Sequence, residues 1–275
     1  MTRTELEERV EEAALLVSES EYVVALCGAG VSVESGVPTF RGPDGLWTRL
    51  GQPSTNSYRE FLDDPKSWWE QYLSRSADPA RAEFRDAIER AEPNAGHAAL
   101  VELERAGVLQ HTITQNVDDL HRRAGSRKLT EIHGNRTLVR CIGCEARWPR
   151  EQIAVEEYPP TCAQCGGMVK ADSVMFGEPI PHGALETSLL EIERCDCILL
   201  VGTSATVMPS AGFPRKVAER GGCVIEINTE ETGMTEQADV VLRASAGEAM
   251  RMLARRVLES TRPSTGSGRT GFGSS

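Results

Sequence analysis

The chain has 275 residues, of which 40% are hydrophobic and 26% are charged, as in an ordinary globular protein. Its net charge of −11 disfavours general nucleic-acid binding and favours cationic partners. The first residues, MTRTELEERVEEAALL, lack the apolar core of an export signal, and no apolar run is long enough to span a membrane. We therefore expect a cytoplasmic protein, in which eight cysteines indicate metal binding or chemistry and not disulfides.

The hydrophobic pattern predicts helices that alternate with short buried strands. Residues 1–20 carry apolar side chains at helical spacing and predict an acidic amphipathic helix. Further along, apolar runs that end in glycine or polar residues predict parallel strands. The expected strands are 22–27, 108–114, 197–202, 223–228 and 239–244, and further expected helices are 97–106 and 246–259. This alternation is typical of an α/β protein with a doubly wound parallel sheet, a Rossmann-like fold.

Two segments interrupt this pattern and predict a smaller second domain. Residues 43–95 contain no clear strand and predict a helical insertion, with one helix over 65–75. Residues 136–170 hold four cysteines and predict a zinc ribbon. The tail, 261–275, is rich in Gly, Ser and Thr and is expected to be disordered. The Rossmann-like domain would then consist of residues 1–42, 96–135 and 171–260.

Two CxxC pairs predict a metal site. Cys141 and Cys144 form the first pair, and Cys162 and Cys165 form the second. Four thiolates with this spacing can converge on one Zn²⁺, whereas four unliganded cysteines or a redox pair would make the spacing a coincidence. Four protein ligands leave no open position for a substrate, so we expect one structural zinc ion.

Three strand ends together favour a nucleotide site. Strand 22–27 leads into Gly28-Ala29-Gly30, a turn that can direct backbone N–H groups at a pyrophosphate. This turn alone is a weak signal, because it lacks the full GxGxxG pattern. A second turn, Gly202-Thr203-Ser204, follows another strand, and Asn228 ends a third. Ligands of open α/β sheets bind outside the carboxyl ends of the strands, so the three ends reinforce one another.

A polar cluster follows strand 108–114. Asn116 and Asp118 stand at alternate positions, so both would face a ligand if the backbone there is extended. His133 lies in the loop Ile-His-Gly-Asn, and an imidazole with a pKa near 6.5 suits a general base. A hydrogen-bonded loop histidine without a catalytic role is the alternative. The remaining histidines are expected to be caps, polar strand positions or surface residues: His97, His111, His121 and His182.

These segments resemble the motifs of sirtuins in their order and spacing. The matching segments are GAGVSVESGVPTFRG (28–42), TQNVDDLH (114–121), IHGN (132–135), the paired CxxC, FGE (176–178), GTSATVMPS (202–210) and IN (227–228). The resemblance covers about residues 20–260. It implies an NAD-dependent protein-lysine deacylase, with NAD on the large domain and acyl-lysine proteins or peptides entering between the domains. The implied products are nicotinamide, O-acyl-ADP-ribose and free lysine.

The resemblance also implies residue roles. His133 would be the base that activates a ribose hydroxyl, with Asn116 and Asp118 as its catalytic companions. Phe176, Gly177 and Glu178 would bind the substrate backbone as an added strand. The implied NAD-binding residues are Gly28, Ala29, Gly30, Pro38, Thr39, Phe40, Arg41, Trp47, Gln115, Asn116, Val117, Asp118, Gly202, Thr203, Ser204, Asn228, Thr229, Glu230 and Ala246.

One helix bears on the choice of acyl group. Tyr72 and Arg75 are three residues apart and would share a helical face, where they could bind the carboxylate of succinyl- or malonyl-lysine. A surface pair is the alternative, but this Tyr-x-x-Arg resembles the one in class III sirtuins and follows Asp64-Pro65 and Trp69. We therefore expect desuccinylation and demalonylation beside deacetylation. The sequence departs from the family at Asn56, where class III members often have alanine, at Asp119, where others have glycine, and at Ala171-Asp172, where a proline is usual.

Three other functions are alternatives to deacylation. Mono-ADP-ribosyl transfer or simple NAD hydrolysis could use the same site. A nucleic-acid-binding ribbon is disfavoured because residues 136–170 form no basic stripe. An NAD sensor without turnover does not account for His133.

Overall fold

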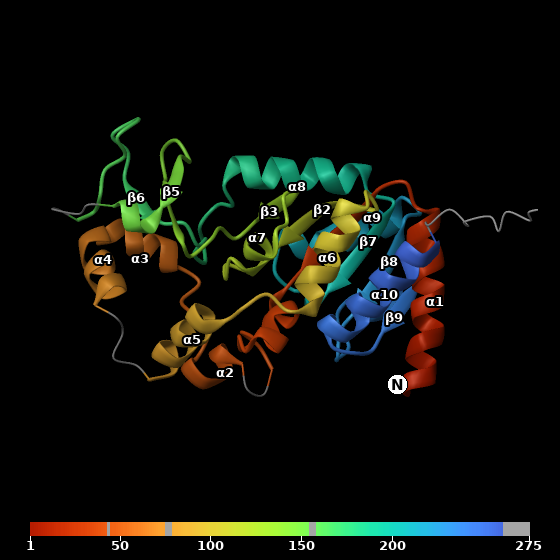
Figure 1. Ribbon diagram of the computed structural model, residues 1–275. Helices are drawn as coiled ribbons and strands as arrows, with labels where there is room; N and C mark the ends of the chain where they lie inside the picture. Colours follow the sequence, from red (N-terminus) through yellow and green to blue (C-terminus); the bar gives the residue numbers. More distant parts are fainter. Residues whose placement is uncertain (43–44, 75–78, 154–157, 261–275) are drawn as a thin grey trace, which may run out of the picture.

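The chain folds around one parallel sheet (Figure 1). The computed structural model describes residues 1–42, 45–74, 79–153 and 158–260. The sheet strands are β1 (Val23–Cys27), β2 (Leu109–Thr114), β3 (Leu129–Glu131), β7 (Cys197–Val201), β8 (Cys223–Ile227) and β9 (Val240–Leu242). Their spatial order is β3-β2-β1-β7-β8-β9, and all pairs are parallel. The order reverses between β1 and β7, which places a ligand-binding crevice at the carboxyl ends of these two strands.

Alternate residues of the strands build two apolar cores, one on each face. In β1, Val23 and Ala25 belong to the core under the helices α1, α6 and α10, whereas Val24 and Leu26 belong to the core under α8 and α9. Because both faces are covered, the central strands β1 and β7 are apolar throughout. The covering helices are α1 (Arg3–Glu19), α6 (Ala95–Arg105) and α10 (Ala246–Ser260) on one face, and α8 (His182–Arg194) and α9 (Phe213–Glu219) on the other. A short helix, α7 (Leu120–Ala124), follows β2.

A second module lies beside this sheet (Figure 1). It contains a three-stranded antiparallel sheet in the order β5-β4-β6. Its strands are β4 (Leu138–Cys141), β5 (Arg147–Pro149) and β6 (Val169–Ala171). Helices α3 (Ser57–Asp63) and α4 (Pro65–Leu73) pack on it through a core that contains Phe61 and Trp69. The remaining helices of the first half are α2 (Leu46–Leu50) and α5 (Pro79–Arg90), and the 3₁₀ turns are η1 (Ala29–Ser35), η2 (Arg150–Gln152), η3 (Ser210–Gly212) and η4 (Thr235–Gln237).

The predicted fold class is confirmed, with two differences in detail. All five predicted strands form, and the predicted helices at 1–20, 65–75, 97–106 and 246–259 begin and end within two residues of the expected bounds. The short strand β3 and the helix α8 were not predicted; β3 has only three residues, too few for a periodic signal. Within the described part of the chain, no helix has the length and apolar character needed to cross a bilayer. The tail predicted to be disordered, 261–275, lies outside the described residues.

Candidate active site

A cavity of about 840 Å³ opens at the carboxyl ends of β1, β2, β7 and β8. Cavities of this size bind cofactors and drug-sized ligands. It is lined by most of the residues predicted to bind NAD or substrate: Gly28, Ala29, Gly30, Pro38, Thr39, Phe40, Arg41, Trp47, Gln115, Asn116, Val117, His133, Phe176, Gly177, Glu178, Gly202, Thr203, Ser204, Asn228, Thr229, Glu230 and Ala246. The three sequence-distant strand ends and the His133 loop therefore meet at one place. Asp118 and Tyr72 do not line the cavity.

The two glycine turns hold each other in place. The N–H groups of Gly28 and Gly30 donate to the carbonyl oxygens of Val201 and Gly202, at 3.0 and 2.8 Å. A Cβ on Gly28 or Gly30 would approach Gly202 within 2.7 Å, so close packing of the turns requires glycine here. The expectation that these two N–H groups bind a pyrophosphate is therefore corrected, because both are used inside the fold. Among the described residues, nothing accepts the backbone N–H of Ala29 or of Ser204, and both residues line the cavity.

Asn116 lines the cavity as expected, whereas Asp118 does not and is joined to Asn116 by a buried hydrogen-bond chain. The Asn116 amide donates to the Gly28 carbonyl and to Ser32 Oγ, both at 3.1 Å. Ser32 Oγ donates in turn to Asp118 Oδ2 at 2.7 Å. Asp118 is 6% exposed, and its other oxygen accepts the Leu120 N–H. The backbone bends at residues 118 and 119, and the alternate spacing does not place Asp118 in the cavity. Asp118 instead holds Asn116 in place through Ser32.

The geometry of His133 suits a base. Its Nδ1 lies 3.1 Å from the carbonyl oxygen of Gln115, which can only accept, so Nδ1 carries the proton and Nε2 is left as an acceptor. Burial lowers the pKa of His133 below 6.5, against a smaller opposing effect of the Gln115 hydrogen bond. The imidazole is therefore neutral at pH 7, as a base must be.

The backbone and packing at position 134 require a glycine directly after His133. The φ of Gly134 is +78°, and a Cβ would lie 2.1 Å from the carbonyl oxygen of Asp172. The segment after β6 thus packs directly on the His133 loop, and the Val174 N–H donates to the His133 carbonyl at 2.9 Å.

Aromatic side chains cover the cavity. Phe40 lies 5.4 Å from both Trp47 and Phe84, measured between ring centroids, and Trp47 lies 5.5 Å from Phe176. The Arg41 guanidinium lies 4.5 Å above the Trp47 ring. These contacts join the loop after β1 to helix α5 and to the Phe176 segment, and they form an apolar cover that can exclude water.

The four predicted cysteines form a cluster that fits one zinc ion. All four sulfur atoms lie within 4.8 Å of one another. Cys141 Sγ is 3.5 Å from Cys165 Sγ, and Cys144 Sγ is 3.7 Å from Cys162 Sγ. A tetrahedron with Zn–S bonds of about 2.3 Å has edges of about 3.8 Å, so the spacing matches a structural zinc site. The Gly143 and Gly167 N–H groups donate to Cys141 and Cys165, which stabilises the thiolates.

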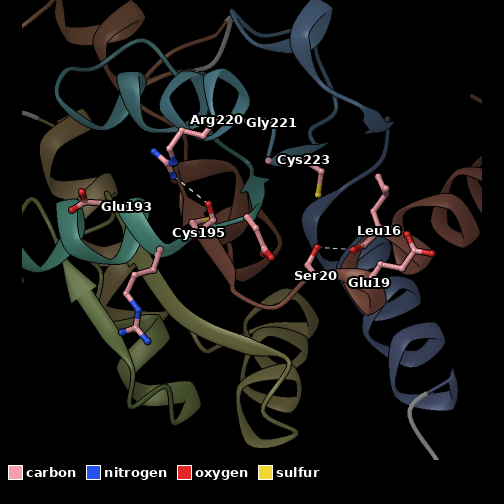
Figure 2. Close-up of a pocket in the computed structure, with 11 residues that line it drawn as sticks. Leu16, Glu19, Ser20, Glu193, Cys195, Arg220, Gly221 and Cys223 are labelled. Atoms are coloured by element: carbon pink, nitrogen blue, oxygen red, sulfur yellow. Dashed lines mark hydrogen bonds between the residues drawn. The ribbon is translucent and has the colours of Figure 1, made fainter.

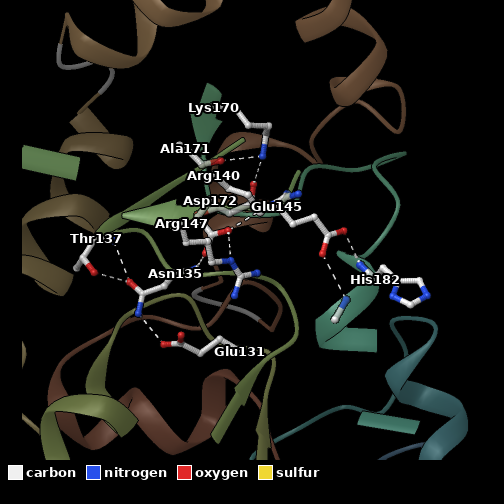
Figure 3. Close-up of polar contacts among 12 residues, drawn as sticks. Glu131, Asn135, Thr137, Arg140, Glu145, Arg147, Lys170, Ala171, Asp172 and His182 are labelled. Atoms are coloured by element: carbon white, nitrogen blue, oxygen red, sulfur yellow. Dashed lines mark hydrogen bonds and ion pairs between the residues drawn. The ribbon is translucent and has the colours of Figure 1, made fainter. Parts of the chain in front are cut away.

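A buried ion cluster joins this ribbon to the active-site loops (Figure 3). Arg140, on β4, donates to Asp172 at 2.9 Å and to Glu178 at 2.5 Å. Lys170, on β6, lies 3.0 Å from Glu178. These four side chains are at most 4% exposed.

The same cluster fixes both loops of the cavity. Asp172 Oδ2 accepts the Asn135 N–H, two residues after His133, at 2.9 Å. Glu178 accepts the Met175 N–H at 2.8 Å. The Glu178 carboxylate therefore faces the ion cluster and holds the Phe176–Glu178 turn in shape. The departure at Ala171-Asp172 places Asp172 at the centre of this arrangement.

Structural contacts explain much of the residue pattern of helix α4, which carries Tyr72. Asp64 caps α4 by accepting the Ser67 N–H, and Trp69 donates from Nε1 to the Val169 carbonyl of the ribbon. Tyr72 stacks on Trp68 at 4.9 Å, and the Arg150 guanidinium covers its ring. Arg75 lies outside the described residues. Asn56 precedes α3 as its N-cap residue, with no side-chain cap bond.

Sequence reasoning missed the burial of His121 and several residues that line the cavity. His121 is buried beside His97, with ring centroids 4.8 Å apart, and is neither a cap, a strand residue nor a surface residue. The prediction is confirmed for His97, whose Nδ1 accepts the Asn94 N–H in the cap of α6. Glu34 lines the cavity and accepts the Gly247 N–H at the start of α10, a contact between distant segments that no local pattern signals. Other unpredicted lining residues are Val33, Gly42, Pro53, Phe84, Ser173, Val174, Met175, Ile180, Val207, Met208, Ile227, Glu231, Thr232, Ala244 and Ser245.

Known proteins share this arrangement. The Sir2 family pattern matches residues 28–209. NAD-dependent protein deacylase 1 of Archaeoglobus fulgidus is 45% identical over 241 residues, 88% of this chain and 95% of that protein. A solved complex of a Sir2 homolog with NAD superposes with a TM-score of 0.75 at 44% identity, covering 91% of this chain and 94% of the other. A Sir2 complex with a p53 peptide and NAD⁺ gives a TM-score of 0.70 at 31% identity, covering 90% and 97%.

The family match covers more than half of the chain, and the relatives are covered almost completely. The fold, the cavity and the cysteine cluster agree with it. This chain belongs to the Sir2 family, the sirtuins.

Proposed function

We propose that this protein removes acyl groups from lysine side chains of proteins in an NAD-dependent reaction. The observation that carries the proposal is the meeting of His133, with an accepting Nε2, and the strand ends of β1, β7 and β8 around one cavity. Relatives named NAD-dependent protein deacylase support the same reaction. When bound, NAD would supply the ribose that accepts the acyl group and releases nicotinamide.

His133 is proposed to take a proton from a ribose hydroxyl at Nε2, because its Nδ1 proton is held by the Gln115 carbonyl. Asn116 would orient the ribose side of the cofactor, and Asp118 would fix Asn116 through Ser32. Phe40 and its aromatic neighbours would exclude water from the reacting carbon. Ser204, Asn228 and the other strand-end residues would bind the adenosine half.

The substrate is proposed to be an acyl-lysine peptide that lies against Phe176–Glu178 in extended form. The backbone of this segment would provide the binding groups, since the Glu178 carboxylate is bound by Arg140 and Lys170. The Sir2–peptide complex supports a peptide ligand. We propose no membrane or nucleic-acid partner. We propose that the protein is located in the cytoplasm.

Desuccinylation and demalonylation are proposed beside deacetylation on the Tyr-x-x-Arg pattern alone. Tyr72 is packed between Trp68 and Arg150 and does not line the cavity, so a carboxylate clamp would also depend on Arg75.

Steady-state kinetics on one lysine peptide, acetylated or succinylated, tests the proposal. The wild type should consume NAD and release O-acyl-ADP-ribose in equal amounts, and His133→Ala should lose about 10²–10⁴-fold in kcat, the usual contribution of a general base. Arg75→Met should lower succinyl turnover and leave acetyl turnover unchanged. NAD cleavage without consumption of acyl-lysine would instead establish the hydrolase or ADP-ribosyltransferase alternative.

A further inference from the structure

Two cysteines outside the zinc cluster lie together at the amino ends of β7 and β8, the end of the sheet opposite the active site. Cys197 is the first residue of β7, Cys223 is the first residue of β8, and they are partners in the parallel register. Adjacent strands are about 4.8 Å apart, and paired residues point to the same face. This spacing lies within the Cα separation that a disulfide spans, about 4.4–6.8 Å.

A third cysteine nearby lies on the other face. Cys195 ends α8 and belongs to the core under α8 and α9, whereas Cys197 and Cys223 pack in the core under α1 and α10. The Cys195 thiol donates to the Cys197 carbonyl at 3.1 Å. The fold therefore brings Cys223 together with Cys197 and holds Cys195 apart.

One thiol of the pair is accessible from a cavity of about 500 Å³ (Figure 2). The end of α1, the turn after α8 and the loop before β8 line this cavity, and both Cys223 and Cys195 are among the lining residues. Cys195 is buried there, at 4% exposure. Cys223 is half-buried and its sulfur points toward Ser20, whereas Cys197 is fully buried.

The three thiols also differ in acidity. Hydrogen bonding with the Cys197 thiol lowers the pKa of Cys223 and outweighs its partial burial. Burial raises the pKa of Cys195 to about 12. Cys223 is thus both the most accessible and the most acidic thiol of this group, which are the two conditions for a reactive cysteine.

We propose that Cys223 and Cys197 form an oxidation site that reacts with hydroperoxides. In the first step the Cys223 thiolate attacks the terminal OH oxygen of the peroxide and the O–O bond breaks. Hydroxide leaves from hydrogen peroxide, or alkoxide from an alkyl hydroperoxide, and Cys223 becomes a sulfenic acid. In the second step the Cys197 sulfur attacks the Cys223 sulfur, the S–O bond breaks, and water leaves with the Cys197 proton. The two thiols lose two electrons to the peroxide and end as a disulfide between β7 and β8.

Peptide mapping of the full-length, zinc-loaded protein tests this site. The protein is exposed briefly to hydrogen peroxide below the concentration that releases zinc, free thiols are blocked with N-ethylmaleimide, and the protein is digested with trypsin without reductant. Cleavage after Arg194, Arg220 and Arg243 separates Cys223 from the other two cysteines. We expect a cross-linked pair of peptides that begin at Cys195 and at Gly221.

Single substitutions then assign the partner. Cys195→Ser should retain the cross-link, since Cys195 lies on the opposite face. Cys197→Ser should abolish it and leave a Cys223 sulfenic acid that a dimedone probe labels. Loss of the cross-link in Cys195→Ser, a cross-link to a zinc-cluster cysteine, or a Cys223 that stays reduced until zinc is released would each overturn the proposal.

Discussion

The six-stranded sheet and the ribbon module are stabilised by different interactions. The sheet buries apolar side chains on both faces, and β1, β2, β7 and β8 end in the glycine and polar turns that line the cavity. The ribbon module has a small core, to which the four-cysteine cluster and four nearly inaccessible charged side chains are added. A zinc ion bound by the four cysteines would add to the stability of a module with a core of this size. The active-site loops lie between the two regions, so each region should affect catalysis by a different route.

Loss of zinc should show the largest difference in response between the two regions. Cys141→Ser or removal of zinc by a chelator should unfold the ribbon, since structural zinc contributes about 10–16 kcal/mol in small zinc domains. The loops that carry His133 and Phe176 then lose Asp172 and Glu178 as anchors, and deacylase activity should fall to background. Peptide turnover and zinc content measured together test this, with Cys223→Ser as the control.

The sheet should survive the same treatment. None of its strands includes a residue of the ribbon, so the circular dichroism spectrum of the zinc-free protein should retain the α/β signal. Full unfolding of the chain on zinc removal would show that the two regions are not separable.

Substitution of Arg140 should have the next largest effect. Arg140→Met leaves Asp172 and Glu178 buried with one cation fewer, and removal of one partner from a buried ion cluster costs about 3–5 kcal/mol. The matched control is Arg147→Met, because Arg147 also contacts Asp172 but is 29% exposed. We expect a large decrease in kcat and in thermal stability for Arg140→Met and a small one for Arg147→Met. Equal effects of the two would mean that burial does not govern the cluster.

Particular residues show why the sequence predicted the sheet better than the site. Five strands were predicted because a strand buried on both faces is a continuous apolar run. The position of the Asp118 side chain could not be predicted in the same way. It depends on a loop that turns after β2 and on Ser32, which comes from another segment. Likewise, the cluster of Arg140, Lys170, Asp172 and Glu178 joins residues from separate strands and loops, and no spacing rule connects them.

Acid should weaken the sheet domain through two buried histidines. Burial lowers the pKa of His97 from 6.5 to about 4, although the negative charge of Asp118 acts in the opposite direction. Burial also lowers the pKa of His121 well below 6.5. The unfolded chain takes up protons near pH 6.5 while the folded chain does not, so stability is full above pH 6.5 and decreases as pH falls toward 4. Urea unfolding at a series of pH values measures this loss.

His121→Leu provides the control for that titration. Neither ring nitrogen of His121 has a hydrogen-bond partner among the described residues, so leucine removes the titration without removing a bond. The pH slope between 6.5 and 5 should become shallower in this variant. An unchanged slope would assign the acid sensitivity to other groups.

The smallest effect is expected at Asp119, on the boundary between the two regions. Asp119 has φ +70°, a conformation that costs a non-glycine residue about 1–2 kcal/mol, and glycine would remove this cost. However, Asp119 also accepts a hydrogen bond from the Asn135 amide at 2.7 Å, and such a bond contributes about 0.5–1.5 kcal/mol. The two terms nearly cancel, so Asp119→Gly should change the free energy of unfolding by less than about 1 kcal/mol. Asp119→Ala keeps the strain and loses the bond, and should be the less stable variant; if it matched Asp119→Gly, backbone strain at this position would be negligible.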